Sequence, residues 1–248
     1  PSQPPATSPA EAREFTRPGR DGIPEGECER VTSTRLTVPS RTGEREGEKP
    51  MEDRIEARIL VVCTANVIRS PFVAGLLRSR LDAAAAGAVR VDSVGVAARS
   101  GRAVDPHAAD IALTYGVHLD AHRAAPLNEA ALEDRTVVLC AERGHVSAVV
   151  RMRPDLTGSV FTVRQFARAV EAARSTGPAP PDWATLVRAA ATARADERPV
   201  AVYDDEIVDP VGRPEDVWGV FERQSVQAVS SILAAAQAIE AICDRGEK

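Results

Sequence analysis

The chain has 248 residues, of which 44% are hydrophobic, and its formal net charge at pH 7 is −5. This length accommodates one large domain or two small ones. The mildly acidic balance argues against a nucleic-acid-binding protein, which would need a concentrated basic surface, so we expect no nucleic-acid partner. The four cysteines show neither metal-ligand spacing nor a paired framework: Cys28, Cys63, Cys140 and Cys243.

The scattered cysteines and the lack of a recognisable signal peptide are typical of a reducing compartment, so the sequence predicts a cytoplasmic protein. The most apolar segment, residues 226–243, is interrupted by Ser230, Ser231, Gln237 and Glu240. A membrane-spanning helix needs about 20 predominantly apolar residues, and we therefore expect no membrane partner. The sequence contains no indication of the oligomeric state.

Residues 1–56 are dominated by Pro, Ser, Glu, Arg and Gly, and their few apolar residues are isolated. Opposite charges alternate there without a helical period, a composition typical of disordered segments. We therefore predict a disordered, solvated tail, with a docking arm or regulated tail as the alternative. Cys28 lies within it and has no evident partner.

From residue 58 onward, predicted strands alternate with predicted helices. The apolar run at 59–62 predicts a buried parallel strand, and further strands are predicted at 89–95, 136–140 and 160–163. Helices are predicted at 71–78, 108–115, 142–152, 164–174 and from 214 or 215 into the 240s. This alternation predicts an α/β fold: a single doubly wound domain at 57–248, with a four-stranded parallel sheet flanked by helices.

Residues 175–204 interrupt the alternation with a proline-rich loop at 175–181 and an additional amphipathic helix at 183–195. We interpret this segment as a peripheral insertion. The alternatives are a helix that caps the active site or one that carries a surface for a partner.

The first predicted strand ends at Cys63, and five residues separate this cysteine from Arg69 and Ser70 at the start of a helix with Pro71 in its first turn. A strand–loop–helix turn directs several backbone N–H groups and the positive end of the helix dipole at one point, which makes an anion site. A thiol there can ionise, and a guanidinium there can hold two phosphate oxygens. A cysteine at the end of a buried strand is more commonly a small core residue. The context instead predicts a cysteine-dependent phosphatase with no metal or cofactor, because Arg69 and the loop amides carry the charge.

The same stretch resembles the phosphate-binding loop of the low-molecular-weight protein tyrosine phosphatases of the bacterial type, Val-Cys-x-Gly-Asn-x-Cys-Arg-Ser-Pro. Cys63, Asn66, Arg69, Ser70 and Pro71 match this pattern, whereas Ala65 replaces the glycine and Ile68 the second cysteine. Segments 92–95 and 116–124 are also similar to the family, 142–145 resembles a stretch common in bacterial members, and Asp209-Pro210 is similar to the loop that carries the family's general acid. The resemblance covers residues 58–245, apart from the insertion.

This resemblance implies that Cys63 is the nucleophile, that Arg69 holds the phosphate and that Asp209 is the general acid. It implies that the phosphate is bound by the loop residues Thr64, Ala65, Asn66, Val67, Ile68, Arg69 and Ser70. It further implies a supporting hydrogen-bond network of Asn66, Ser70, Ser93 and His122, although Ser70 could also be a plain helix N-cap.

The loss of the second cysteine at Ile68 removes the disulfide that protects the nucleophile in many members. Cys140 and Cys243 remain candidates to replace it.

Val67 takes a position that is apolar in the family's tyrosine phosphatases. The resemblance therefore favours phosphotyrosine or another aryl phosphate monoester, carried by a phosphorylated protein or a small aryl phosphate. Phosphoarginine and a small phosphometabolite remain alternatives. Arsenate reduction would need two further cysteines close together, and Cys140 stands alone in its region. A phosphate-binding module without turnover is the alternative outside the enzymes.

Overall fold

The computed structural model describes residues 57–85, 89–198 and 200–246, so the predicted tail and Cys28 lie outside the described part. Its centre is a four-stranded sheet in the order β2-β1-β3-β4, in which every pairing is parallel. The strands are β1 (Ala57–Cys63), β2 (Val89–Gly95), β3 (Val137–Cys140) and β4 (Val160–Thr162). The predicted four-stranded parallel α/β fold is therefore confirmed.

The helices are α1 (Arg69–Ala85), α2 (Pro106–Thr114), α3 (Arg143–Met152), α4 (Val163–Thr176), α5 (Trp183–Asp196), α6 (Val202–Asp205) and α7 (Glu215–Gly246). Two short 3₁₀ helices, η2 (Ala130–Leu132) and η3 (Pro154–Gly158), and the four-residue α6 were not predicted, because they are too short to show a period. Helix α1 begins at Arg69, so Ser70 lies within its first turn and the N-cap interpretation of Ser70 is wrong.

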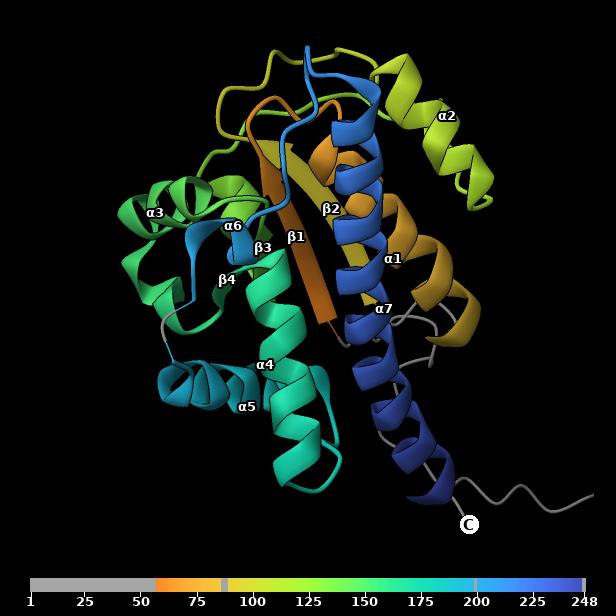
Figure 1. Ribbon diagram of the computed structural model, residues 1–248. Helices are drawn as coiled ribbons and strands as arrows, with labels where there is room; N and C mark the ends of the chain where they lie inside the picture. The colour runs from red at the N-terminus through yellow and green to blue at the C-terminus, as the bar shows by residue number, and fades with distance from the viewer. Residues whose placement is uncertain (1–56, 86–88, 199, 247–248) are drawn as a thin grey trace, which may run out of the picture. The chain divides into compact units, whose positions relative to one another are not determined.

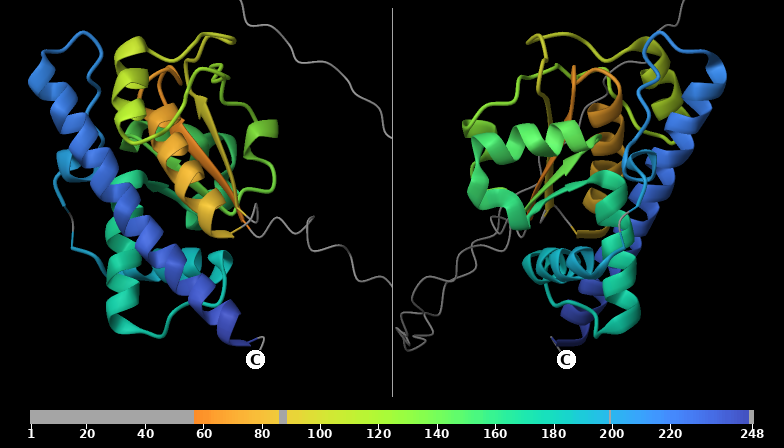
Figure 2. Two further views of the ribbon diagram at one scale, coloured as in Figure 1. Left: turned by 90° about the vertical axis from the view of Figure 1, so that its right-hand side faces the viewer. Right: turned by 60° about the vertical axis from the view of Figure 1, so that its left-hand side comes forward.

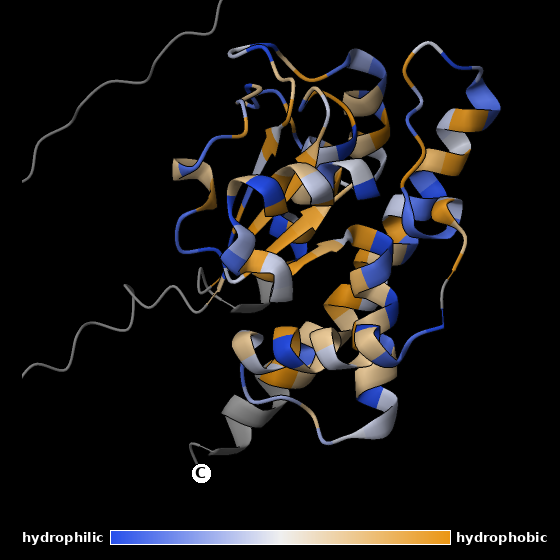
Figure 3. Cartoon of the chain, turned by 90° about the vertical axis from the view of Figure 1, so that its left-hand side faces the viewer, coloured by the Kyte–Doolittle hydropathy of each residue, from blue (hydrophilic) through white to orange (hydrophobic). Residues whose placement is uncertain are grey.

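The two faces of the sheet are covered by different helices, as Figures 1 and 2 show. Side chains alternate along a strand, so Ile59, Val61 and Cys63 face a core shared with α1, α4 and α7, whereas Leu60 and Val62 face a smaller core shared with α3 and η2. Both faces of the central strands are buried, and in Figure 3 these strands are accordingly coloured as hydrophobic.

The additional helix α5 packs at the end of the sheet away from Cys63. It buries Trp183 and Leu186 in the larger core, and its Arg194 donates to the carbonyls of Val160 (2.7 Å) and Thr157 (3.1 Å) at the amino end of β4. Because Cys63 lies at the carboxyl end of β1, the alternative in which this helix caps the active site is wrong (Figure 1). Among the described residues, no helix is long and apolar enough to cross a membrane.

Candidate active site

The loop that follows β1 folds back over Cys63 at the carboxyl edge of the sheet. Asn66 has a positive φ of 54°, a left-handed conformation that asparagine tolerates better than most residues. This turn brings the backbone nitrogen of Asn66 to 3.3 Å from the sulfur of Cys63, and the hydroxyl of Ser70 lies 3.0 Å from the same sulfur. Cys63 therefore ends a strand with its thiol next to a backbone N–H of the loop and to a hydroxyl in the first turn of α1.

The loop packs directly on the end of β2, where the sequence has a glycine. The backbone nitrogens of Val96 and Ala97 donate to the carbonyls of Cys63 (2.9 Å) and Thr64 (2.8 Å). A Cβ atom at Gly95 would lie 2.6 Å from the carbonyl oxygen of Thr64 and 2.8 Å from the nitrogen of Asn66. Only glycine permits this close approach of two backbones.

Asn66 links the loop to three other segments. Its Nδ2 donates to the hydroxyls of Ser70 (2.8 Å) and Ser93 (3.0 Å), its Oδ1 accepts from the nitrogen of Ala125 (2.9 Å), and its carbonyl oxygen accepts from Nε2 of His122 (2.8 Å). Burial lowers the pKa of His122, while the bond to Asn66 acts in the opposite direction. The structure thus brings together all four residues of the expected network.

The guanidinium of Arg69 is 2% exposed and lies between two carboxylates. Nη2 donates to Asp209 Oδ2 (2.6 Å) and to Thr64 Oγ1 (3.1 Å), while Nη1 pairs with Glu142 and donates to the carbonyl of Ile207 (3.3 Å). Asp209, which the family resemblance suggested as the general acid, therefore lies at this arginine. Of the loop residues 64–70, Thr64 and Ala65 are half-buried and the others are buried.

Glu142 and His145 also belong to the site, although no pattern in the sequence predicted a role for either. Glu142 precedes α3, and His145 in its first turn places Nε2 3.0 Å from Thr64 Oγ1. Burial and the charge of Arg69 lower the pKa of His145, against the opposing charges of Glu142 and Asp209. Both residues follow β3, which the strand register sets beside β1. The resemblance of residues 142–145 to bacterial members did not reveal this contact, because strand order is not visible in the sequence.

The segment before Asp209 is held by charged side chains of α3 and α4. Asp205 is 1% exposed and accepts from Arg143 Nε (2.8 Å) and from Arg168. Arg164 donates to the carbonyls of Tyr203 (2.6 Å) and Glu206 (3.1 Å). These contacts connect the segment that leads to Asp209 with the helix that follows Glu142.

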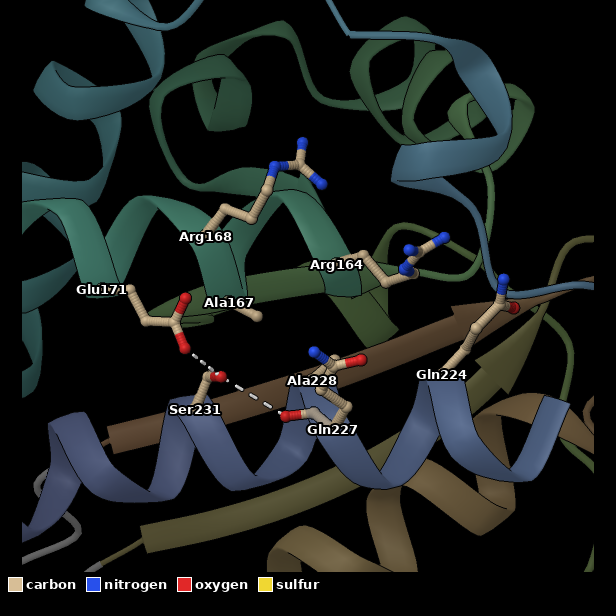
Figure 4. A pocket seen from close by; sticks show the side chains of 8 residues that line it. All are labelled: Arg164, Ala167, Arg168, Glu171, Gln224, Gln227, Ala228 and Ser231. Atoms are coloured by element: carbon tan, nitrogen blue, oxygen red, sulfur yellow. Dashed lines mark hydrogen bonds between the residues drawn. The ribbon is translucent and has the colours of Figure 1, made fainter. Parts of the chain in front are cut away.

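A cavity of about 140 Å³ lies between α4 and α7 (Figure 4). Its walls are formed by Arg164, Ala167, Arg168, Glu171, Gln224, Gln227, Ala228 and Ser231. Gln224 accepts from the nitrogen of Val208 (2.9 Å), and Ser231 donates to Glu171. Arg164 and Gln224 in its walls thus bond to the segment that leads to Asp209.

Cys140 cannot protect Cys63 as a disulfide partner. It pairs in register with Val62, and both side chains belong to the smaller core, whereas Cys63 faces the opposite side of the sheet. Burial raises the pKa of the Cys140 thiol well above its usual range, and the charge of the nearby Cys63 thiolate acts in the same direction. The suggestion that Cys140 replaces the missing cysteine is therefore wrong, and the side chain of Cys243 lies outside the described residues.

Comparisons with known proteins agree with this geometry. The profile of a family described as low molecular weight phosphotyrosine protein phosphatase matches residues 58–181. The low molecular weight protein-tyrosine-phosphatase Etp of Escherichia coli K12 is 34% identical over 108 residues, which are 44% of this chain and 70% of Etp. A protein-arginine-phosphatase of Geobacillus stearothermophilus is 35% identical over 109 residues, with the same coverage of 44% and 70%.

Solved structures of two phosphatases share the fold of this chain. The YwlE arginine phosphatase from Geobacillus stearothermophilus aligns with a TM-score of 0.53 and 25% identity, over 73% of this chain and 93% of that one. A low molecular weight protein tyrosine phosphatase from T. tengcongensis aligns with a TM-score of 0.54 and 21% identity, over 72% and 98%, and supports the fold alone. Asp209 lies beyond the residues that the family profile matches.

Proposed function

The chain belongs to the low molecular weight phosphotyrosine protein phosphatase family, and we propose that it is a cysteine-dependent phosphatase that hydrolyses phosphotyrosine or other aryl phosphate monoesters through a phosphocysteine intermediate. One observation carries the proposal. The buried thiol at the carboxyl end of β1 accepts from the backbone N–H of Asn66 and lies beside the hydroxyl of Ser70, and the arginine of the same loop is paired with Asp209. A site that only bound phosphate would need neither the thiol nor the acid.

Cys63 is the nucleophile in this mechanism. Its thiolate is stabilised by the N–H of Asn66, the hydroxyl of Ser70 and the positive end of α1. The sulfur attacks the phosphorus in line, and the bond from phosphorus to the leaving oxygen breaks as the phosphocysteine forms. The donors that favour the thiolate also favour its departure in the second step.

Arg69 holds two oxygens of the phosphate and stabilises their charge in the transition state, which a lysine without the planar fork could not do equally well. The backbone N–H groups of residues 64–70 complete the phosphate-binding loop. Nη2 of Arg69 donates to Asp209 Oδ2 in this structure, and we expect a bound phosphate to take over this N–H group.

Asp209 then serves as the general acid. It gives its proton to the leaving oxygen and afterwards takes a proton from the water that attacks the phosphocysteine, a contribution typically of about 10²–10⁴-fold. Its carboxylate is partly exposed, next to Arg69, and its segment is anchored through Asp205. These contacts support a loop that presents the acid at the mouth of the site.

The substrate preference follows from the side chains around the phosphate loop. Val67 is buried and apolar, which suits a phenyl ring and offers no hydrogen-bond partner to a guanidinium. Val96 and Val211 are exposed and neither has an aromatic ring, so neither can contribute ring stacking, which is worth about 0.5–1.5 kcal/mol. We therefore expect a high Michaelis constant and a modest rate with aryl phosphates.

Phosphoarginine is the second candidate, because two carboxylates, Glu142 and Asp209, are partly exposed beside the phosphate site and would attract a cationic leaving group. A relative at 35% identity also bears the name protein-arginine-phosphatase. The absence of a polar side chain at Val67 argues for the aryl substrate.

We also propose that residues 57–248 form the phosphatase domain with 175–204 as an insertion, and that the protein acts in the cytoplasm. The helix α5 of this insertion supports the domain by packing in its larger core.

The experiment that tests the function is turnover of peptides that carry phosphotyrosine, phosphoserine or phosphoarginine, with p-nitrophenyl phosphate as a small aryl substrate. We expect release of phosphate from the tyrosine peptides and the aryl substrate, and none from phosphoserine. A preference for phosphoarginine in the unmodified chain would overturn the aryl assignment, and no turnover of any substrate would overturn the phosphatase itself.

A further inference from the structure

His145 is buried beside the phosphate loop with one ring nitrogen unpaired. The residue is 4% exposed, and Nε2 lies 3.0 Å from Thr64 Oγ1. Within the described part of the chain, Nδ1 is buried and has no hydrogen-bond partner. Buried polar atoms are nearly always paired, and an unpaired one next to a reactive centre calls for a functional explanation. A leucine here would fill a similar volume without an unpaired nitrogen.

The hydrogen bonds at Thr64 decide where its own proton can point. Thr64 Oγ1 accepts from Arg69 Nη2 at 3.1 Å, and a guanidinium can only donate. A hydroxyl has two lone pairs and one proton. When Nε2 of His145 carries the ring proton and donates as well, both lone pairs are used, and the proton of Thr64 must point to a third partner.

The other tautomer is less favourable in this environment. If Nε2 accepted the proton of Thr64, the ring proton would be on Nδ1, and a buried N–H donor would have no partner. Burial lowers the pKa of His145, which favours a neutral ring with a single proton. In the favoured tautomer, Nε2 of His145 carries the ring proton and donates it to Thr64 Oγ1. The hydroxyl proton of Thr64 is then available to another acceptor.

We propose that His145 is a positioning residue that turns the Thr64 hydroxyl into a hydrogen-bond donor to a non-bridging oxygen of the bound phosphate. This inference rests on the proposed function, because the proposed function places the phosphate between Cys63 and Arg69. Thr64 follows Cys63 directly and contacts Arg69, so a phosphate oxygen held by this arginine lies beside the Thr64 hydroxyl. His145 itself does not touch the substrate and acts only through Thr64.

Binding of inorganic phosphate to the full chain, measured by titration calorimetry, tests this without requiring turnover. Thr64→Val and His145→Leu should each weaken phosphate binding about tenfold, the scale of one hydrogen bond to a charged group. The double variant should bind no more weakly than either single one, because both changes remove the same donor. Thr64→Ser and His145→Gln, which keep a hydroxyl and an N–H donor, should recover most of the affinity.

A purely structural role of His145 predicts a different pattern. Val149→Ala, which opens a cavity on the same helix α3 without reaching Thr64, is the matched control: it should lower the melting temperature and leave phosphate binding unchanged. The inference is overturned if His145→Leu binds phosphate as tightly as the unmodified chain does. It is also overturned if the affinity lost in the double variant is the full sum, in free energy, of the losses in His145→Leu and Thr64→Val. If the unmodified chain neither binds phosphate nor releases it from aryl esters, the proposed function fails and the inference with it.

Discussion

The buried carboxylate of Asp205 permits a quantitative prediction about stability. Its side chain is 2% exposed and pairs with Arg143 and Arg168, whose side chains are 44% and 31% exposed. Asp205→Asn keeps one acceptor oxygen but removes the charge and turns an N–H group toward a guanidinium. Disrupting a fully buried ion pair costs about 3–5 kcal/mol, and since both arginines stay partly hydrated we expect about 2–3 kcal/mol here.

The assay is thermal unfolding of the full chain, followed by circular dichroism. For a domain of this size, each kcal/mol of stability corresponds to about 2–4 °C, so the melting temperature should fall by roughly 4–12 °C. Asp155→Asn is the matched control, because Asp155 also receives two bonds from one arginine, Arg153, at 2.8 and 2.6 Å, but is 59% exposed. We expect no resolvable change in its melting temperature, since exposed pairs contribute little.

The same substitution should also affect catalysis, because Asp205 anchors the segment that leads to Asp209. At a temperature where the variant is folded, we expect slower turnover of substrates with poor leaving groups and unchanged inhibition by inorganic phosphate. If Asp205→Asn lowers the melting temperature no more than Asp155→Asn does, burial does not set the strength of this pair and the reasoning is refuted.

The remaining predictions concern the site directly. Cys63→Ser should abolish turnover of p-nitrophenyl phosphate and leave the melting temperature unchanged; a variant that retains more than residual activity would exclude Cys63 as the nucleophile. Asp209→Asn should slow poor leaving groups about 10²–10⁴-fold and good ones far less, and equal losses in steady-state assays of both would argue against a general acid. Gly95→Ala should reduce kcat/KM by about 10²-fold because its Cβ displaces the phosphate loop, while Gly158→Ala, with open space around it, should not. Val67→Thr should shift the ratio of phosphoarginine to phosphotyrosine turnover roughly tenfold upward, and an unchanged ratio would exclude this residue as the selector.

The sequence by itself determined the part of the site that is local. Cys63, Asn66, Arg69 and Ser70 lie within eight consecutive positions at a strand-to-helix junction, and this junction alone directs backbone N–H groups at one point. Hydrophobic periodicity likewise predicted the four strands and the longer helices, because each buried face repeats within its own segment. The unpredicted α6 was too short for such a repeat.

Only the tertiary structure decided which distant side chains meet this loop. Glu142 reaches Arg69 across 73 positions and His145 reaches Thr64 across 81, because β3 lies beside β1 in the sheet. The register also decided that Cys140 faces away from Cys63, since a shift of one residue reverses the face of every side chain. Strand order and register are set by how both faces of the sheet are buried together, and no local pattern in the chain carries that information.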